Sequence, residues 1–270
     1  MSGPLLLLGC GKMGGALLRG WLDQRIAGTA DKPVFVVEPS DVALKPLAGA
    51  ANVTRVSDVN GLKPSVVLLA VKPQMMDAAL ASLGAVKESK PLFLSIAAGK
   101  TLGYFAKRLG AGAAVVRSVP NTPASVGRGV TVAVANRHVT PAMRETAQAL
   151  LAAVGEVHWV ADEGLLDAVT AVSGGGPAYV FLLIEALAEA GRQAGLPADL
   201  AMRLARVTVQ GSGELARLSG ESPSVLRQNV TSPNGTTLEA LKILMAVDGL
   251  QPLFNRAIAA AAKRSRELAG

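Results

Sequence analysis

Two kinds of segment carry the residues whose types and spacing suit chemistry. One is a glycine-rich turn, Gly9-Cys10-Gly11-Lys12-Met13-Gly14, and the others are hydroxyl-rich loops further along the chain. Glycines at this spacing allow a tight turn and let the pyrophosphate of a dinucleotide approach the backbone. The first amide groups of a following helix then bind the phosphate oxygens. The turn therefore predicts a dinucleotide site, and its alternative is a glycine-rich turn without a ligand.

The glycine-rich turn has this meaning only between a strand and a helix. The apolar run Leu5–Gly9 predicts the strand and Lys12–Gln24 predicts the helix. Further strands are expected at Val34–Glu38, Val66–Val71, Leu92–Ile96, Ala114–Ser118, Val130–Ala135 and Val157–Val160, with helices near Gln74–Leu83, Thr101–Leu109 and Pro141–Val154. Such alternation is typical of a parallel sheet covered on both faces. Residues 1–162 therefore predict an α/β, doubly wound, Rossmann-type dinucleotide-binding domain.

After Asp162 the strand patterns stop, and Ala and Leu recur at helical spacing. Residues 163–270 therefore predict an all-α domain for substrate binding and oligomerisation. We expect the glycines at 174–176 to interrupt the helical pattern and Pro177 to begin a new helix. Helices are expected over 177–194, 198–218, 237–247 and 252–268.

An acidic residue, Glu38, ends the second predicted strand, 24 positions after Gly14. A carboxylate there accepts hydrogen bonds from the adenosine ribose of NADH and repels the 2′-phosphate of NADPH. No arginine occurs in Pro39-Ser40-Asp41 to offset that repulsion. The sequence therefore favours NADH over NADPH, and the alternative is that Glu38 merely points to solvent.

The composition limits the class of protein. Charged residues make up 17% of the 270 residues, against about 25% in a typical soluble domain, so part of the surface is expected to be buried in a homo-oligomer. No segment reaches the ~18 consecutive apolar residues of a membrane span, and Leu5–Leu8 is too short for a signal peptide, so we expect a cytoplasmic protein without a membrane partner. The net charge of +7 comes from dispersed Lys and Arg with only 3% aromatic residues, which argues against nucleic acid.

Cysteine and histidine are too scarce for a disulfide or a typical metal site. The single cysteine, Cys10, has no partner within the chain, and the two histidines are His138 and His158. Neither histidine neighbours a candidate nucleophile, so both are expected to be structural. The sequence predicts no metal.

Four blocks of small, hydroxyl and proline residues stand where predicted elements end. Val71-Lys72-Pro73 and the block from Arg117 to Pro123 each follow a predicted strand. The blocks 173–179 and 229–237, Ser-Gly-Gly-Gly-Pro-Ala-Tyr and Asn-Val-Thr-Ser-Pro-Asn-Gly-Thr-Thr, lie in the helical part. In this order and spacing the four blocks resemble those of pyrroline-5-carboxylate reductases over essentially the whole chain.

This resemblance implies reduction of the cyclic imine 1-pyrroline-5-carboxylate to L-proline by hydride transfer from NADPH or NADH, the last step of proline biosynthesis. It also implies a helical domain that interlocks with a partner subunit, in a homodimer or in a larger ring such as a decamer. Three residues depart from the family pattern. Gly175 stands where serine is usual, and Glu38 stands where small hydroxyl residues often line the ribose end. Asn234 replaces a glycine but tolerates the same left-handed backbone.

The candidate site residues form three groups. Thr237 and Ser232 are the candidate catalytic residues, and the resemblance implies that Thr237 directs its hydroxyl at the ring nitrogen. Substrate binding is expected at Ser173, Gly174, Gly235 and Thr236. Cofactor binding is expected at Gly9, Gly11, Lys12, Met13, Gly14, Glu38, Ala70, Val71, Lys72, Pro73 and Asn121.

The turn before the helix at Thr237 suits a carboxylate, because free amides at a helix N-terminus bind anions. Thr236 with Glu239 three positions later matches a capping box, which predicts Thr236 as the N-cap. An ordinary helix start would explain Thr236 alone, but not the crowding of Ser232, Gly235 and Thr237 in the same turn.

The chemistry of imine reduction agrees with these residue types. It needs a hydride donor, a hold on the carboxylate and a hydrogen-bonding group near the ring nitrogen, but no strong acid when the imine enters protonated. Lys72 beside Pro73 is therefore expected to contribute to the cofactor surroundings and not to proton transfer.

Two other classes of protein compete with this interpretation. A dehydrogenase of 3-hydroxy acids needs an acid or base, commonly a lysine on a helix after a glycine-rich stretch. Here no lysine occurs between Gly176 and Lys242. A regulator that binds NAD(P) without chemistry would have no use for hydroxyl-rich loops in its second domain.

Overall fold

The computed structural model describes residues 3–45 and 49–269. They group into two compact units. Unit 1 comprises the chain up to Gly174 together with the residues from Ala261 on, and unit 2 comprises Gly175–Ala260. The expected division at Asp162 is a prediction about function, and the boundary between the compact units lies after Gly174 instead.

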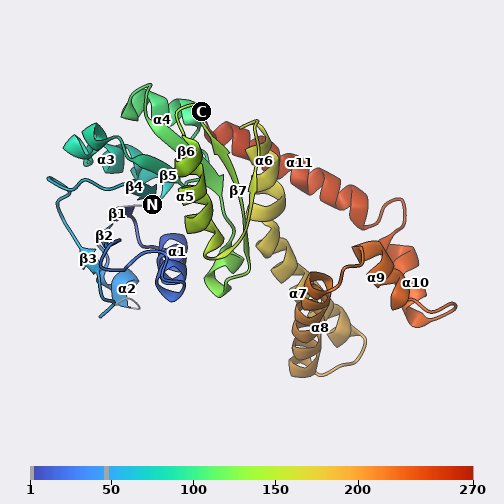
Figure 1. Cartoon of the computed structure of the whole chain (residues 1–270). Helices are drawn as coiled ribbons and strands as arrows, with labels where there is room; N and C mark the ends of the chain where they lie inside the picture. The colour runs from blue at the N-terminus through green and yellow to red at the C-terminus, as the bar shows by residue number, and fades with distance from the viewer. Residues whose placement is uncertain (1–2, 46–48, 270) are drawn as a thin grey trace. The chain divides into compact units, whose positions relative to one another are not determined.

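Unit 1 is built on a sheet of eight strands within the described residues (Figure 1). The strands are β1 Leu5–Leu8, β2 Val34–Val37, β3 Val53–Arg55, β4 Val66–Leu69, β5 Leu92–Ser95, β6 Ala114–Val119, β7 Gly129–Ala135 and β8 Gly155–Trp159. Their order is β3-β2-β1-β4-β5-β6-β7-β8; neighbours are parallel except β7, which runs antiparallel to β6. From β1 the strand order continues outward through β2 and β3 on one side and through β4 and β5 on the other. Sheets of this type bind ligands at such a switch point, which here lies between β1 and β4.

Helices cover both faces of this sheet (Figure 1). One face packs on α1 Lys12–Asp23 and α5 Pro141–Ala152, and the other on α3 Met76–Ala81 and α4 Leu102–Leu109. Along β1, Leu5 and Leu7 join the first cluster, whereas Leu6 and Leu8 join the second. A continuous run of buried leucines is typical of a parallel strand covered twice.

The fold class predicted from the sequence is confirmed. Each predicted strand forms with ends within two residues of those expected, and so do the helices of unit 1 that were predicted. The sequence patterns missed β3 and the short α2 Asp41–Leu44. Strand β3 has a polar, partly exposed sequence, Val-Thr-Arg, so it shows no apolar run.

Unit 2 is helical throughout its regular structure. Its helices are α7 Gly176–Gln193, α8 Ala198–Leu218, α9 Pro223–Asn229, α10 Thr236–Leu244 and the first part of α11 Leu250–Ala269. Helices α7 and α8 pack closely at Gly191, where an added Cβ would lie 3.4 Å from the Cβ of Ala201. Helix α9 was not predicted.

The expected interruption of the helical pattern is present, although its form differs. After α6 Leu165–Val169, the residues Thr170–Gly174 wind as a π-helical turn and Gly175 bends. Pro177 lies in the first turn of α7, as predicted. The missing amide hydrogen of proline is harmless there, because first-turn amides have no partner within the helix.

The last part of α11 completes unit 1. The hydroxyl of Ser265 donates a hydrogen bond to the Asp167 carboxylate over 2.6 Å. The carbonyl oxygen of Leu268 lies 3.1 Å from the position that a Cβ on Gly99 would take. Unit 1 is therefore assembled from two pieces of chain that are separated by unit 2.

Unit 2 buries almost none of its apolar side chains. Among its described residues, the buried hydrophobic side chains are those of Ala188, Ala201 and Ala205. Large apolar residues are exposed along its helices, among them Phe181, Leu182 and Leu183 on α7, Leu204, Val207 and Leu215 on α8, Ile243 and Leu244 on α10, and Leu253 on α11. Within the described chain, the helical stretch Leu165–Gln193 is long and apolar enough to cross a membrane by length and composition alone (mean hydropathy 1.4). Another surface must cover these side chains.

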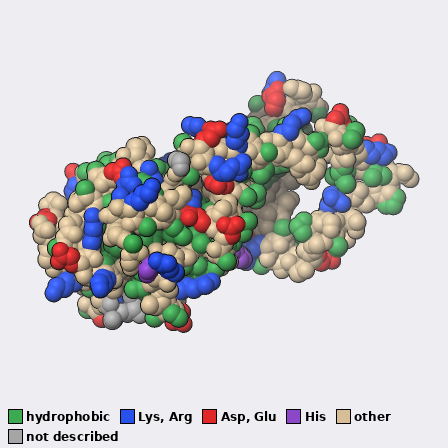
Figure 2. All heavy atoms as spheres, turned by 90° about the horizontal axis from the view of Figure 1, so that it is seen from above, with side chains coloured by type: hydrophobic (Ala, Val, Ile, Leu, Met, Phe, Trp, Pro, Cys, Tyr) green, Lys and Arg blue, Asp and Glu red, His purple; other side chains and the backbone are tan. Residues whose placement is uncertain are grey.

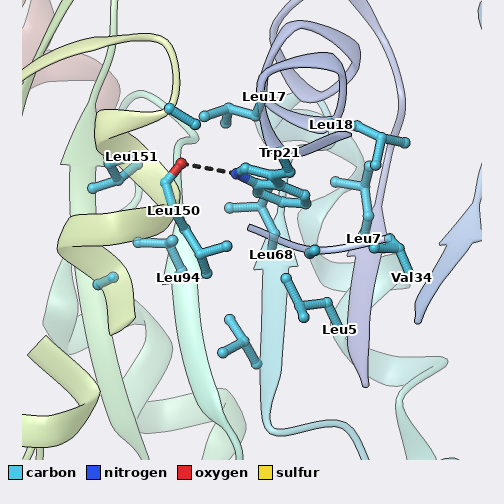
Figure 3. Close-up of a cluster of buried hydrophobic side chains, with 14 of the residues drawn as sticks. Leu5, Leu7, Leu17, Leu18, Trp21, Val34, Leu68, Leu94, Leu150 and Leu151 are labelled. Atoms are coloured by element: carbon cyan, nitrogen blue, oxygen red, sulfur yellow. Dashed lines mark hydrogen bonds between the residues drawn. The ribbon is translucent and has the colours of Figure 1, made fainter. Parts of the chain in front are cut away.

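Trp21 joins α1 to α5 at the centre of the first cluster (Figure 3). Its ring is fully buried, and its indole Nε1 donates to the carbonyl of Leu150 over 2.8 Å. Leu150 lies in the last turn of α5, where carbonyl groups lack helical partners. The side chain therefore fills the core and satisfies a helix end.

We predict that Trp21→Phe lowers the free energy of unfolding by about 2–3 kcal/mol, because a cavity forms and the Leu150 carbonyl loses its donor. The measurement is urea unfolding followed by circular dichroism. Trp159→Phe is the matched control: that indole donates to the Gln148 side chain in a half-buried position, where water can replace it. Equal losses in both variants would contradict the prediction.

Candidate functional site

The glycine-rich turn joins β1 to α1 at the carboxyl edge of the sheet. Gly9 has a φ of +92°, and a Cβ there would lie 2.8 Å from the carbonyl oxygen of Ala70. At Gly14, a Cβ would lie 2.3 Å from the carbonyl oxygen of Gly9. At Gly11, in contrast, it would meet no atom within 4 Å. The packing of the protein itself requires the first and third glycines, whereas the second borders open space.

Helix α1 begins without a side-chain cap. Gly11 is its N-cap, and the first helical hydrogen bond runs from the Gly15 amide to the Gly11 carbonyl over 2.8 Å. The preceding amides of Lys12, Met13 and Gly14 lie in the first turn, where the helix offers them no acceptor. Open space at Gly11 and the positive end of the helix dipole suit a phosphate group. The residues present thus fit the dinucleotide that the sequence predicts.

The strand order brings the other predicted cofactor residues to the same edge. Because β1, β2, β4 and β6 run in one direction, Glu38, Ala70–Pro73 and Asn121 all follow carboxyl ends of strands. Lys72 is exposed and precedes a short 3-10 helix. The Asn121 side chain accepts a hydrogen bond from the Val130 amide over 2.9 Å, so it also fixes the start of β7.

Glu38 does not merely point to solvent. One carboxylate oxygen accepts a hydrogen bond from the Cys10 amide (2.8 Å) and the other from the Ser40 amide (2.9 Å). These bonds hold the negative charge at the rim of the glycine-rich turn. They also tie the end of β2 to that turn.

Cys10 is the one thiol of the chain. Burial, and to a lesser degree the Glu38 carboxylate, raises the pKa of the thiol to about 11. Cys10 is therefore protonated at neutral pH, and nucleophilic chemistry at this position is disfavoured.

Ser173 and Gly174 lie in the π-helical turn of unit 1. A Cβ on Gly174 would lie 3.7 Å from a methyl of Val119, so the turn lies beside the end of β6. The Ser173 hydroxyl is buried and finds no hydrogen-bond partner among the described residues. Leaving a buried hydroxyl unpaired costs about 1–3 kcal/mol, and π-helical turns occur frequently at functional sites. Both facts favour a ligand partner for Ser173.

In unit 2 the loop before α10 forms a tight turn. The Gly235 amide donates to the Ser232 carbonyl over 3.1 Å, and Asn234 adopts the left-handed conformation expected for it (φ +59°). A Cβ on Gly235 would lie 2.4 Å from the Ser232 hydroxyl, so a side chain at position 235 would displace that hydroxyl. Thr236 and Thr237 are exposed in the first turn of the helix.

The predicted capping box at Thr236 is wrong. The N-cap is Gly235, no side chain caps the helix, and Glu239 pairs with Lys242 over 2.7 Å. Because Gly235 has an extended backbone (φ −82°, ψ 163°), the helix starts one residue earlier than the capping motif indicates. The first amides of α10 are consequently uncapped, as those of α1 are.

The predicted site residues thus fall into two groups. Unit 1 brings together Gly9, Gly11, Lys12, Met13, Gly14, Glu38, Ala70, Val71, Lys72, Pro73, Asn121, Ser173 and Gly174 at or beside the carboxyl edge of its sheet. Unit 2 brings together Ser232, Gly235, Thr236 and Thr237 in one turn. A recess of about 710 Å³ in unit 1, lined by Ser65, Leu92 and Met143, contains none of them.

An ion pair between a buried arginine and a partly buried glutamate was not predicted from the sequence. Arg117 in β6 is 3% exposed, and its guanidinium lies 2.7 Å from the Glu163 carboxylate. The same carboxylate oxygen accepts a hydrogen bond from the Leu102 amide over 2.8 Å. It therefore ties β6 to the start of α4. One signal for it was present: a lone arginine in the apolar run Ala114–Val119.

Comparison with known proteins gives consistent matches along the chain. Residues 163–268 match the family described as "Pyrroline-5-carboxylate reductase dimerisation", and residues 5–99 match "NADP oxidoreductase coenzyme F420-dependent". The pyrroline-5-carboxylate reductase of Pseudomonas aeruginosa is 39% identical over 100% of this chain and 98% of its own length. That of Synechocystis is 42% identical over 99% of both chains.

Solved structures agree. A pyrroline-5-carboxylate reductase from Coxiella burnetii superposes with a TM-score of 0.91 at 35% identity, covering 100% of both chains. The Plasmodium falciparum pyrroline carboxylate reductase, solved with NADP bound, gives a TM-score of 0.80 at 28% identity, covering 99% of this chain and 100% of its own.

We predict that Gly11→Ala weakens dinucleotide binding at least about tenfold while stability changes by less than about 0.5 kcal/mol, because the new methyl enters open space that the pyrophosphate needs. Gly9→Ala should instead lower the stability of the protein, because the substitution strains the backbone and brings a methyl against the Ala70 carbonyl. Calorimetric titration and thermal unfolding measure the two effects. Unchanged dinucleotide binding in Gly11→Ala would remove the turn from the site.

Proposed function

Since the chain belongs to the pyrroline-5-carboxylate reductase family, we propose which of its residues carry out the family's reaction. The protein reduces 1-pyrroline-5-carboxylate to L-proline with a nicotinamide cofactor, the last step of proline biosynthesis. We assign cofactor binding to residues 1–162 and substrate binding and assembly to residues 163–270. The observation that carries these assignments is the pair of helix starts without a side-chain cap, at Gly11 and at Gly235, each of which follows a glycine-containing turn.

The cofactor, when bound, supplies the hydride. The turn from Gly9 to Gly14 would hold its pyrophosphate, because open space lies over Gly11 and free amides follow it. Glu38 would hold the adenosine ribose, and Ala70–Pro73 and Asn121 would line the rest of the nucleotide along the same edge. The carboxylate of Glu38 repels a 2′-phosphate, so NADH is the preferred cofactor in this proposal.

The substrate carboxylate is assigned to the first turn of α10. Its amides have no side-chain cap, and the dipole of this helix favours a negative group at that end. Gly235 permits the turn, while Thr236 supplies a first-turn amide. The unpartnered hydroxyl of Ser173, beside Gly174, is assigned as a further donor to the substrate.

Thr237 and Ser232 are assigned to the reacting atoms. The Thr237 hydroxyl hydrogen-bonds the ring nitrogen and orients the imine, which enters already protonated. Hydride arrives at the imine carbon, the C=N double bond becomes a single bond, and its electron pair stays on nitrogen as the amine of proline. Ser232, held beside Gly235, completes the polar surroundings of the nitrogen. This chemistry requires no strong acid, and Lys72 is left outside it.

The chain assembles with copies of itself, since its helical part belongs to a dimerisation family. That family match covers the whole apolar stretch Leu165–Gln193, so a second subunit instead of lipid is the proposed cover for its exposed face. We place the enzyme in the cytoplasm as a homodimer or a larger ring such as a decamer. The Lys and Arg side chains in the view of Figure 2 are interspersed with acidic and uncharged groups, which gives no stripe for nucleic acid.

We predict that the purified protein oxidises NADH only when the cyclic imine is present and forms L-proline in equal amount. Loss of the reduced-nicotinamide absorbance and chromatography of proline measure the two quantities. With NADPH the value of kcat/KM should be lower, because Glu38 opposes the extra phosphate. Folded protein that forms no proline with either cofactor would refute the function.

We predict that Thr237→Val lowers kcat/KM by about 10- to 100-fold with little change in stability, because the side-chain shape is kept and only the hydroxyl is lost. Thr236→Val is the matched control, because the Thr236 hydroxyl does not cap the helix and is assigned no contact with the ring nitrogen. Steady-state kinetics and thermal unfolding of both variants give the comparison. A normal Thr237→Val with an inactive Thr236→Val would show that the roles are exchanged.

A further inference from the structure

A cation reaches the ribose end of the proposed cofactor site from the strand that sequence patterns missed. Arg55 is the last residue of β3, which pairs in parallel with β2 so that Arg55 lies opposite Val36. Its guanidinium Nη2 donates to the carbonyl of Pro39 over 2.8 Å, and its Nη1 forms an ion pair with Asp41. The positive charge therefore lies beside the loop that directly follows Glu38.

Among the described residues, the charged side chains that form hydrogen bonds or ion pairs at this loop are those of Glu38, Asp41 and Arg55, and Lys45 lines the same recess as Asp41 and Arg55. The Glu38 carboxylate is held by the amides of Cys10 and Ser40, on the side of the glycine-rich turn. The Arg55 guanidinium is held by the Asp41 carboxylate instead. Glu38 and Arg55 therefore do not neutralise each other through any contact in this structure, and each is available to a different part of the adenosine ribose.

An arginine at this place suits a 2′-phosphate. A guanidinium offers paired N–H donors that match phosphate oxygens, and arginines near the end of the second strand accommodate the 2′-phosphate in dinucleotide-binding sheets. The Arg55 side chain is 45% exposed and that of Asp41 82% exposed. An ion pair so open to water is weak, so a phosphate of higher charge can take the place of the Asp41 carboxylate.

We propose that Arg55 is the residue that admits the 2′-phosphate of NADPH, and that Asp41 restrains it by pairing with the same guanidinium. Glu38 favours NADH, Arg55 keeps NADPH usable, and the Arg55–Asp41 pair sets the ratio between them. The proposal rests on the proposed function only in placing the nucleotide at the glycine-rich turn. The proposed specificity residue comes from β3 and not from the loop that follows Glu38.

The test is the dissociation constant of NADH and of NADPH, measured by calorimetry on the full-length oligomer. Arg55→Gln should weaken NADPH about tenfold and leave NADH unchanged, because only the phosphate loses its donor. Asp41→Asn should strengthen NADPH about threefold or more, because the guanidinium is released. Added salt should weaken NADPH more in the wild type than in Arg55→Gln.

Arg137→Gln is the matched control. It removes the same charge from an exposed position after β7, next to the amino end of β6 and so at the opposite edge of the sheet. It should leave the ratio of the two constants unchanged. If Arg55→Gln loses its fold, Asp41→Asn and Arg55→Lys, which keeps the charge but not the paired donors, carry the test.

Two results would overturn the proposal: an unchanged NADPH-to-NADH ratio in the folded Arg55→Gln protein, or an Asp41→Asn protein that binds NADPH no better than the wild type. Failure of the proposed function looks different. In that case the wild type binds neither nucleotide, or binds both and forms no proline.

Discussion

The close approach of backbone to backbone at the start of α1 is the constraint on which the rest of unit 1 depends. Gly9 lies against the Ala70 carbonyl and Gly14 against the Gly9 carbonyl, so the turn tolerates no side chain at either position. This contact holds the end of β1 against the end of β4, and it leaves open space at Gly11, where α1 begins. The buried leucines of β1 then hold the strand from both faces, which keeps the turn in place. The geometry that we propose for phosphate binding is thus a consequence of packing within the protein itself.

Much of this architecture could be predicted from the sequence, because buried parallel strands are apolar runs and the helices between them are periodic. What failed did so for physical reasons. Strand β3 lies at the edge of the sheet and needs few apolar residues, so the sequence of Val53–Arg55 did not indicate a strand. For the same reason Arg55 was not recognised as a residue near Glu38. The cap at Thr236 was wrong because a motif in sequence does not reveal that Gly235 is extended. Burial of the Ser173 hydroxyl depends on packing against elements distant in sequence, which no local pattern records.

The low charge content has its explanation in unit 2. Small residues let α7 and α8 approach, as at Gly191 and Ala201, and the large apolar side chains consequently face outward. A helical unit that buries only alanines cannot be stable through its own core, since apolar burial is the main favourable term in folding. We therefore expect association with further copies to stabilise the turn that carries Thr237. Since Thr237 is proposed to act in catalysis, we expect the activity to depend on that association.

Because the last part of α11 belongs to unit 1, unit 1 cannot complete its folding early in synthesis on the ribosome. The bond between Asp167 and Ser265, and the packing of Leu268 on Gly99, join residues that are made about a hundred positions or more apart. Most of unit 1 is synthesised first, but it lacks the segment from Ala261 on until unit 2 has been made. A chain that stops before Ala261 therefore lacks these contacts, and the core of unit 1 stays incomplete.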